Sequence, residues 1–291
     1  MREFSTVIVG AGAAGLAAAI SAKRKNTSCV ICERLPKIGK KILASGNGRC
    51  NISNEDLSSV NYNKASRALV ASVFGKFGSS AIKDFFLGLG LELTAEGNRI
   101  FPATNQSLSV LKILEIEINR LGVPIELGFS VDSIRPEANG FLILSASGKT
   151  LKCKTVIITG GGKSYPALGS DGSAYKLASL IGHRIVPPVP SAVPLTVKDK
   201  LCHFAQGQRI EANIKAVVNG EAVTEARGDL LFTKYGLSGT AILDISRDVS
   251  IALNRVPAVQ VYIEADIVPF ITEDELIKNI TMAMKDGRPQ E

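Results

Sequence analysis

The sequence predicts an α/β protein, in which a parallel sheet with helices forms a first, larger domain and a β-rich domain follows. Three patterns among the 291 residues favour this fold class. Residues 4–9, 13–25 and 28–33 have the composition of a strand, an alanine-rich helix and a strand, which together have the length of a βαβ unit. Residues 155–159 form a further apolar run that ends in three glycines. Four prolines crowd residues 187–194 and indicate the exit from the first domain.

The remaining elements of the first domain follow from periodicity and turn residues. Helices are expected at 64–74, 79–89 and 106–121, a hairpin at 92–101, a strand at 124–127 and a three-stranded meander at 131–154. We expect residues 155–159 to be a separate strand that returns the chain to the parallel sheet. Asp171 is expected to cap a helix that ends at Ile181.

Beyond the prolines, residues 210–218 and 221–226 flank an Asn-Gly pair, which predicts a tight hairpin. A helix at 238–243 and a strand at 259–265 complete the β-rich part. Thr272 and Glu275 have the spacing of a capping box, so a final helix is expected to begin there.

The segment VIVGAGAAG, residues 7–15, carries the strongest chemical signal. It follows a strand and opens a helix, and Glu33 ends the next strand. In that setting Gly10 permits a tight turn, Gly12 lets a pyrophosphate approach the helix N-terminus, and Gly15 lets helix and strand pack closely. Glu33 would accept hydrogen bonds from a ribose diol and repel a 2′-phosphate. The pattern predicts a Rossmann-like dinucleotide-binding domain; glycines that only permit a tight turn are the alternative.

Residues 155–162, TVIITGGG, indicate which dinucleotide binds. An apolar strand that ends in Thr-Gly-Gly after a meander resembles the second fingerprint of FAD proteins of the glutathione-reductase class, and a glycine-rich strand-to-helix loop is the alternative. A plain NAD dehydrogenase does not need the meander, so FAD is preferred to NAD.

The formal charge of +7 is also localised. Residues 1–54 hold nine Lys or Arg against two acidic residues, and the other 25 basic and 25 acidic residues cancel. Residues 37–51 combine several of these cations with three glycines, so the loop could wrap an anionic cofactor. A localised excess indicates an anion site and argues against a nucleic-acid surface.

Three segments carry a family resemblance: ILASGNGRCNISN (42–54), GGGKSYPALGSDGSAY (160–175) and LLFTKYGLSGTAIL (230–243). They resemble the BaiN/YhiN-like family of bacterial NAD(P)/FAD-dependent oxidoreductases, which includes aminoacetone-oxidase-type flavoproteins. The resemblance implies a Rossmann-like FAD-binding domain at 1–190, an inserted β-barrel-like domain at 191–270 and the start of a truncated helical domain at 271–291. Family members continue into a C-terminal segment that contacts the flavin, and we expect this chain to lack it.

The resemblance also implies which residues bind FAD. The ADP half would be held by Gly10, Gly12, Ala14, Glu33 and Arg34. The pyrophosphate and flavin side would be wrapped by Ser45, Gly46, Asn47, Gly48, Arg49, Cys50 and Asn51. Gly15 and Lys41 are also predicted to belong to the cofactor site. The adenine would meet the backbone of Val131, and the site would be closed by Thr159, Gly160 and Gly161.

The function expected from these features is that of an FAD-dependent oxidoreductase, which transfers a hydride between the flavin and a small organic substrate. NAD(P)H is a candidate reductant, and the sequence identifies no catalytic side chain. The alternatives are an FAD-dependent flavoprotein that modifies tRNA and a truncated, non-catalytic flavoprotein. A small molecule is the favoured partner, without nucleic acid or membrane.

The five cysteines are too few and too irregularly spaced for a disulfide framework, and no apolar run has membrane length, so we expect a cytoplasmic protein. Cys29 and Cys32 would point to opposite faces of one strand, which favours burial over redox or zinc chemistry. Ser45 stands five residues before Cys50, near where disulfide reductases of this fold carry their redox pair, so no internal disulfide is expected there. The two histidines lack partners at ligand spacing, and no metal site is predicted.

Overall fold

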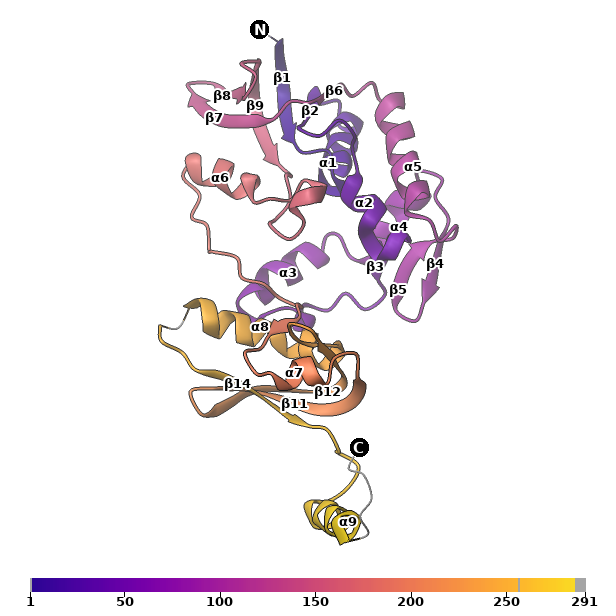
Figure 1. Ribbon diagram of the computed structural model, residues 1–291. Coiled ribbons are helices and arrows are strands. Elements are labelled where there is room, and N and C mark those ends of the chain that lie inside the picture. The colour runs from indigo at the N-terminus through magenta and orange to yellow at the C-terminus, as the bar shows by residue number, and fades with distance from the viewer. Residues whose placement is uncertain (1, 256, 286–291) are drawn as a thin grey trace. The chain divides into compact units, whose positions relative to one another are not determined.

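The computed structural model of the chain describes residues 2–255 and 257–285. Its contacts divide the chain into two units, residues 1–186 and 187–291. Figure 1 gives the order of the elements along the chain.

The first unit contains both strands and helices. Its strands are β1 (Arg2–Val9), β2 (Cys29–Glu33), β3 (Ser53–Asn54), β4 (Leu93–Glu96), β5 (Arg99–Pro102), β6 (Ile125–Leu127), β7 (Val131–Glu137), β8 (Gly140–Ser145) and β9 (Thr150–Ile158). Its α-helices are α1 (Ala13–Arg24), α2 (Lys40–Ala44), α3 (Arg67–Phe74), α4 (Ser79–Leu87), α5 (Ser107–Arg120) and α6 (Ser173–Leu180). Its 3₁₀ helices are η1 (Ser45–Gly48), η2 (Ser59–Asn61), η3 (Lys64–Ser66) and η4 (Pro166–Leu168).

A six-stranded sheet with the order β6-β2-β1-β9-β8-β7 organises this unit. The strands from β6 to β9 are parallel, and β9, β8 and β7 are antiparallel. The α/β class with a Rossmann-like parallel sheet is therefore confirmed. The three strands β3, β5 and β4 form a separate small sheet.

The division of residues 131–159 was predicted wrongly. The third meander strand and the returning strand are one strand, β9, which pairs with β8 over residues 150–153 and with β1 over residues 151–158. Residues 150–158 contain no glycine or proline, so nothing interrupts the extended backbone at Lys154. Beyond Cys153, β9 pairs with β1 alone within the described part of the chain.

Alternating side chains of the sheet divide the core into two clusters. On one face Ile8 and Ile31 pack with Leu16 of α1 and Leu114 of α5. On the other face a second cluster comprises Val7, Val30, Phe129, Leu151 and Leu177. The period of two in β1 and β2 produces this division, because successive side chains point to opposite faces.

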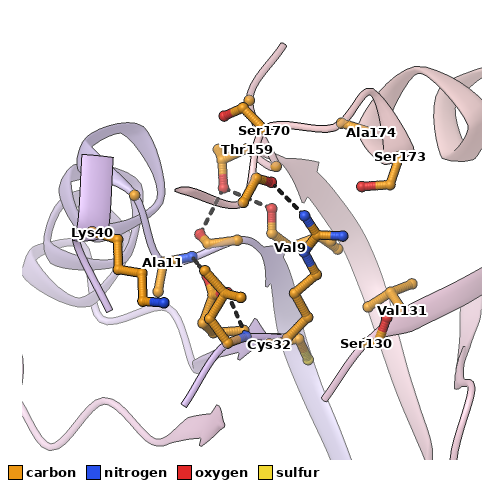
Figure 2. A pocket seen from close by; sticks show the side chains of 18 of the residues that line it. Val9, Ala11, Cys32, Lys40, Ser130, Val131, Thr159, Ser170, Ser173 and Ala174 are labelled. Carbon is orange, nitrogen blue, oxygen red and sulfur yellow. Dashed lines mark hydrogen bonds between the residues drawn. The ribbon is translucent and has the colours of Figure 1, made fainter. Parts of the chain in front are cut away.

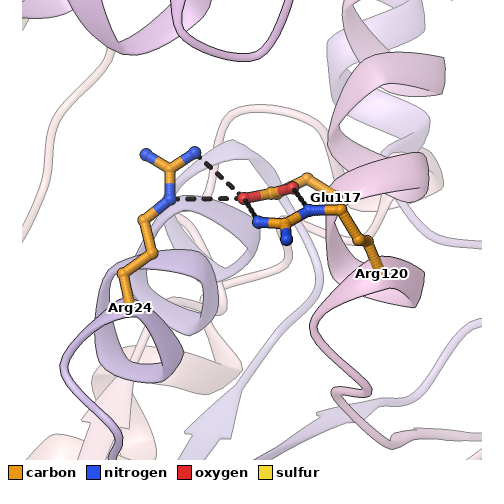
Figure 3. A network of polar contacts seen from close by, with 3 residues as sticks. All are labelled: Arg24, Glu117 and Arg120. Carbon is orange, nitrogen blue, oxygen red and sulfur yellow. Dashed lines mark hydrogen bonds and ion pairs between the residues drawn. The ribbon is translucent and has the colours of Figure 1, made fainter.

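A carboxylate joins the C-terminal ends of α1 and α5 (Figure 3). Glu117 is buried, and it accepts hydrogen bonds from Arg120 at 2.6 and 2.9 Å and from Arg24 at 2.9 and 3.2 Å. The bonds from Arg120 and Arg24 lower the pKa of Glu117 to about 2. The guanidinium of Arg24 also lies over the ring of Phe85, 5.8 Å from its centre, and so extends the contact to α4.

The second unit is an antiparallel sheet with helices. Its strands are β10 (Leu195–Thr196), β11 (Arg209–Val218), β12 (Glu221–Thr233), β13 (Gly236–Ser238) and β14 (Val261–Asp266), and its helices are α7 (Leu201–Phe204), α8 (Thr240–Arg255) and α9 (Glu273–Lys285). The predicted hairpin forms at Asn219-Gly220. The helix expected at 238–243 continues to Arg255, since buried Ile242, Ile245 and Val249 keep its apolar face against the sheet.

The described strands of this unit form an open sheet with β10 and β14 at its edges, whereas the resemblance implied a barrel-like domain. The predicted capping box is present at the start of α9: Thr272 N donates to Glu275 Oε2 at 3.0 Å, and Glu275 N donates to Thr272 Oγ1 at 3.3 Å. In residues 2–255 and 257–285, no helix has both the length and the apolar character needed to cross a membrane.

Candidate functional site

Gly10, Gly15 and Thr159 hold the end of β1 close to β9 and α1. Gly10 has a φ of +107°, and a Cβ there would lie 2.8 Å from the carbonyl oxygen of Thr159. A Cβ on Gly15 would lie 1.9 Å from the carbonyl oxygen of Gly10. The Thr159 hydroxyl donates to the carbonyl oxygens of Val9 and Gly10, each at 2.9 Å. Close backbone packing therefore requires glycine at both positions.

Gly12 differs from these two glycines because a Cβ there would meet nothing within 4 Å. It is the N-cap residue of α1, and its carbonyl oxygen accepts from Leu16 N at 3.0 Å. The N–H groups of a first helical turn have no partner within the helix, and the helix dipole favours negative charge at that end. The space beside Gly12 is thus suited to an anion that approaches the backbone closely.

Glu33 ends β2, and two backbone amides hold its carboxylate. Ala11 N donates to Oε2 at 2.7 Å, and Leu35 N donates to Oε1 at 2.8 Å. The side chain therefore ties the glycine turn to the end of β2, a structural role that the sequence did not predict. Each carboxylate oxygen can accept a second hydrogen bond, so the contact with a ribose diol stays a prediction.

Two cations hold the loop that follows β9. Arg34 donates to Asp171 at 2.6 Å and to the Gly169 carbonyl oxygen at 2.8 Å, and Lys41 Nζ donates to Ser170 Oγ at 2.5 Å. The hydrogen bond from Arg34 holds the pKa of Asp171 well below its usual range. Segment 34–41 and loop 169–171 therefore form one connected wall.

These residues enclose a cavity that we call the glycine-loop pocket (Figure 2). It lies at the carboxyl ends of β1, β2 and β9, where ligands bind in open parallel sheets. Figure 2 shows Val131 and Ser173 facing the ends of these strands across the pocket. The lining consists of residues 9–12, 32–35, 37, 39–41, 129–131, 159–161, 168–170, 173, 174 and 177.

A second cavity, the α1–α4 cavity, lies beyond Gly12. Its volume is about 1140 Å³. The lining consists of residues 12–14, 17, 18, 21, 41, 42, 45, 50–52, 76, 77, 81, 82, 85, 86, 110 and 114. Among the described lining residues, only Gly12 and Lys41 border both cavities. The start of α1 therefore lies where the glycine-loop pocket and the α1–α4 cavity meet.

The predicted site residues divide between these cavities. The predicted residues that line the glycine-loop pocket are Gly10, Gly12, Glu33, Arg34, Lys41, Val131, Thr159, Gly160 and Gly161. Those that line the α1–α4 cavity are Ala14, Ser45, Cys50 and Asn51, together with Gly12 and Lys41, which line both. Neither described lining includes Gly15, Gly46, Asn47, Gly48 or Arg49. Sequence reasoning missed Lys37, Lys40, Ser170 and Ser173, although both segments that contain them had been singled out.

Arg49 is engaged elsewhere. Its guanidinium pairs with Glu96, donates to Asn105 Oδ1 at 2.8 Å and lies over the ring of Phe101, 4.2 Å from its centre. These contacts attach the loop after α2 to the β4–β5 hairpin. A direct contact between Arg49 and a cofactor stays a prediction.

The cysteines are buried thiols without disulfide bonds. Cys29 packs in the first core cluster and Cys32 in the second, so they point to opposite faces of β2, as predicted. Burial raises the pKa of both thiols, that of Cys32 to about 12. The described residues contain no group of three or more His, Cys, Asp or Glu that could hold a metal ion.

Comparison with known proteins identifies relatives. The family described as "HI0933-like protein Rossmann domain" matches residues 4–272. A 3-dehydro-bile acid delta(4,6)-reductase of Clostridium scindens is 39% identical over 84% of this chain and 60% of its own length. A ribosomal RNA dihydrouridine synthase of Escherichia coli is 30% identical over 84% of this chain and 61% of its own length.

The chain thus spans about 60% of the length of these curated relatives. Among solved structures, a 3-ketosteroid-delta4-(5alpha)-dehydrogenase of Rhodococcus jostii matches with a TM-score of 0.44 and 15% identity, over 56% of this chain and 47% of that one. The family match covers most of the chain and confirms the resemblance that its motifs carry. The chain therefore belongs to the HI0933-like family, which is described by its Rossmann domain and is the BaiN/YhiN-type family that its motifs resemble.

Proposed function

We propose that this chain binds one molecule of FAD across both cavities and serves as the cofactor-binding part of an FAD-dependent oxidoreductase. The observation that carries the proposal is that Gly12 and Lys41 border both cavities. A dinucleotide has two unlike ends joined by a pyrophosphate, and this arrangement offers one compartment lined by several charged side chains and one that is mostly apolar, with an anion site between them.

We assign the ADP half to the glycine-loop pocket because of its lining residues. Glu33 faces the pocket with lone pairs available to a ribose diol, and the backbone at Val131 borders the side on which an adenine would lie. The negative charge of Glu33 disfavours a 2′-phosphate. Arg34 is already paired with Asp171, so it is held away from a phosphate at that position.

The pyrophosphate fits between the two cavities. The space at Gly12 admits it to the N-terminus of α1, where backbone dipoles favour negative charge. Lys41 Nζ donates to an uncharged hydroxyl, that of Ser170, and among the described residues it has no carboxylate partner. Its charge is therefore available to a phosphate oxygen.

The flavin half fits the end of the α1–α4 cavity next to Ser45 and Asn51. Bound there, FAD would supply the hydride chemistry, by accepting or giving a hydride at the flavin. The apolar walls, such as Ile42 and Ile52, would exclude water from the reacting centre, and the polar groups of Ser45 and Asn51 could orient the ring. The structure assigns no general acid or base.

The reductase activity of the Clostridium scindens relative supports reduction of a small organic substrate. We propose NAD(P)H as the reductant that returns the flavin to its reduced state. The E. coli relative supports a second candidate, modification of ribosomal RNA, which would place a nucleotide where the small substrate otherwise lies. The first is preferred because the positive excess lies in residues 1–54, which supply Lys37, Lys40 and Lys41 to the glycine-loop pocket.

The test is titration of the purified chain with FAD, with ADP and FMN as the matched halves. We expect FAD to bind more tightly than either half and to raise the melting temperature, since a ligand at a hundred times its dissociation constant adds about 2.7 kcal/mol of stability. Equal affinity for FAD and FMN would contradict use of the glycine-loop pocket.

Two further experiments test the finer proposals. Anaerobic bleaching of the bound flavin by NADH or NADPH tests the reductant. Salt-dependent binding of ribosomal RNA fragments tests the second candidate function.

A further inference from the structure

Residues 45–51, which we call the 45–51 loop, only partly line the α1–α4 cavity. The two ends of the loop line it, through Ser45 at one end and Cys50 and Asn51 at the other, whereas residues 46–49 do not. Cys50 N donates to the Ser45 carbonyl oxygen at 2.9 Å, so the two ends are joined to each other. Residues 46–48 are exposed. The positions of the two lining ends therefore depend on what holds an exposed turn.

The backbone of this turn has a conformation that amino acids with side chains seldom adopt. Gly46, Asn47, Gly48 and Cys50 have φ values of +57°, +55°, +84° and +60°. Asparagine tolerates such a φ through its short polar side chain, but cysteine has no such group. A Cβ on Gly46 would lie 2.6 Å from Asn51 N, so the turn folds back tightly on itself. A backbone of this kind persists where surrounding contacts impose it.

Arg49 supplies those contacts. Within the described chain, it is the only one of residues 46–49 whose side chain forms a hydrogen bond with another element. The guanidinium pairs with Glu96 of β4 and donates to Asn105 Oδ1, from Nη2 at 2.8 Å and from Nε at 3.3 Å. It also lies over the ring of Phe101 in β5. A planar group with several donors can bind two partners and stack on a ring at the same time.

The partners of Arg49 are themselves held in place. Glu96 lies in β4 and pairs in register with Arg99 of β5, and Phe101 is buried. Asn105 lies in the turn between β5 and α5, where its own N–H donates to the Pro102 carbonyl oxygen at 2.8 Å. Neither Glu96 nor Asn105 lines the glycine-loop pocket or the α1–α4 cavity. The contacts of Arg49 thus attach the loop to a framework outside both cavities.

We propose that Arg49 is a positioning residue for the flavin. By joining the 45–51 loop to the β4–β5 hairpin and to the turn before α5, it holds Ser45 and Asn51 where they receive the flavin ring, and it does so without touching the cofactor. The assignment of the flavin to these two residues rests on the proposed function. The attachment of the loop through Arg49 follows from the contacts alone.

The experiment titrates variants of Arg49 and of its partners with FAD and with ADP. Arg49→Ala should weaken FAD binding by about tenfold and leave ADP binding unchanged, because the loop borders only the flavin side. Glu96→Gln and Asn105→Gly should each weaken FAD binding by about two- to fivefold, although neither residue lines a cavity. Glycine is chosen at position 105 because Asn105 has a φ of +53°.

Arg99→Ala is the matched control. Arg99 also lies over the ring of Phe101, 5.9 Å from its centre, but it forms no hydrogen bond with the described 45–51 loop. Visible circular dichroism of the bound flavin, which reports the surroundings of the ring, should change in FAD-saturated Arg49→Ala and stay unchanged in Arg99→Ala. Arg49→Lys should restore little of the lost affinity, because an ammonium cannot reproduce the planar fork.

Two results would overturn the proposal. If Arg49→Ala weakens FAD binding but Glu96→Gln and Asn105→Gly do not, then Arg49 contacts the cofactor directly. If ADP binding falls as much as FAD binding, then the variant has lost general stability, and positioning of the flavin is not the cause.

The failure of the proposed function gives a different result. A wild-type chain that binds ADP but not FAD would refute the proposed function and with it the link to the flavin. Amide hydrogen exchange of the free protein tests the attachment separately. Residues 45–51 should exchange about tenfold faster in Arg49→Ala, and residues 10–15 should exchange at the wild-type rate. Unchanged exchange of residues 45–51 would refute the attachment itself, whether or not FAD binds.

Discussion

The glycine-loop pocket and the α1–α4 cavity share Gly12 and Lys41 but are built differently. The pocket is formed by backbone turns, and its polar side chains are already held, as Glu33 is by two amides. The cavity is formed by side chains of four helices, α1, α2, α4 and α5, and of the segments that follow α2 and α3. Lys41 and Lys76 border it, and neither forms an ion pair with a described residue. This difference indicates that the pocket is organised before a ligand binds, whereas the cavity depends on how its helices pack.

The largest effect is expected at the glycines of the α1 turn. Gly12→Val should weaken FAD binding by about 3 kcal/mol, or about a hundredfold, because the side chain enters the space at the helix N-terminus. Its fold should persist, since no atom lies within 4 Å of the new Cβ. Gly15→Val is the matched variant and should lose about 3 kcal/mol or more of folding stability, because its Cβ overlaps the Gly10 carbonyl oxygen.

The measurements are FAD titration and chemical denaturation of both variants. The comparison fails if Gly12→Val retains normal flavin affinity, or if Gly15→Val unfolds at the wild-type denaturant concentration. Either result would mean that the backbone contacts of the pocket are not what organises it.

The difference between a pocket built from backbone turns and a cavity built from side chains explains what the sequence could predict. The spacing of Gly10, Gly12 and Gly15 acts through backbone conformation, which a local motif encodes. Thr159 was assigned to the same site from its own glycine-rich motif, although 149 positions separate it from Gly10 in the hydrogen bond between them. The family resemblance added Arg34, Lys41 and Val131, which also line the pocket, but not Lys37, Lys40, Ser170 or Ser173.

The α1–α4 cavity could not be predicted in the same way. Phe85 and Ile82 have the spacing of any amphipathic helix, and which surface they face depends on tertiary packing. The contact between Lys41 and Ser170 likewise joins residues 129 positions apart without a shared motif. The continuous strand β9 was missed because a change of pairing partner leaves no trace in a run of strand-forming residues.

The second largest effect concerns Glu33. Glu33→Ala should weaken FAD binding by about 1.5–3 kcal/mol, the range for hydrogen bonds to a charged group. Because Ala11 N and Leu35 N lose their acceptor, the free energy of unfolding should also fall, by about 1–3 kcal/mol. Glu33→Gln, which keeps one acceptor oxygen, should fall between Glu33→Ala and the wild type in both measurements. A loss of stability without any loss of FAD affinity would remove Glu33 from the cofactor site and leave it a structural role.

A smaller effect is expected at Glu117, which supports the cavity rather than the pocket (Figure 3). Its pKa is lowered from 4.5 to about 2 in the folded protein, so its stabilising contribution is complete above pH 4.5 and is lost as the pH falls towards 2. Glu117→Gln should cost about 1–2 kcal/mol at pH 7, since the exposed guanidinium of Arg120 is screened by solvent. The difference from the wild type should vanish near pH 2.

Glu115→Gln is the control for this pH dependence. Glu115 lies on the same helix and pairs with Lys112 on the surface, so its loss should change the free energy of unfolding by less than about 0.5 kcal/mol. Denaturation from pH 2 to pH 7 distinguishes the two variants. FAD affinity at pH 7 should be unchanged in both, and a large loss in Glu117→Gln would show that the pocket and the cavity are coupled through α1.

The smallest effect is expected at Cys50, which borders the cavity on the side assigned to the flavin. Burial raises the pKa of its thiol, so at pH 7 the group is protonated and cannot act as a thiolate donor to the flavin ring. Ser45, whose carbonyl oxygen accepts from Cys50 N at 2.9 Å, stands where a partner thiol would be needed for a redox pair. Cys50→Ser should therefore leave the rate of flavin reduction by a chemical donor unchanged. The absorbance spectrum of the FAD-loaded wild type should contain no long-wavelength charge-transfer band. A band that is present in the wild type and absent from Cys50→Ser would show that the cavity holds a reactive thiolate, and that its apolar walls do not keep this group neutral.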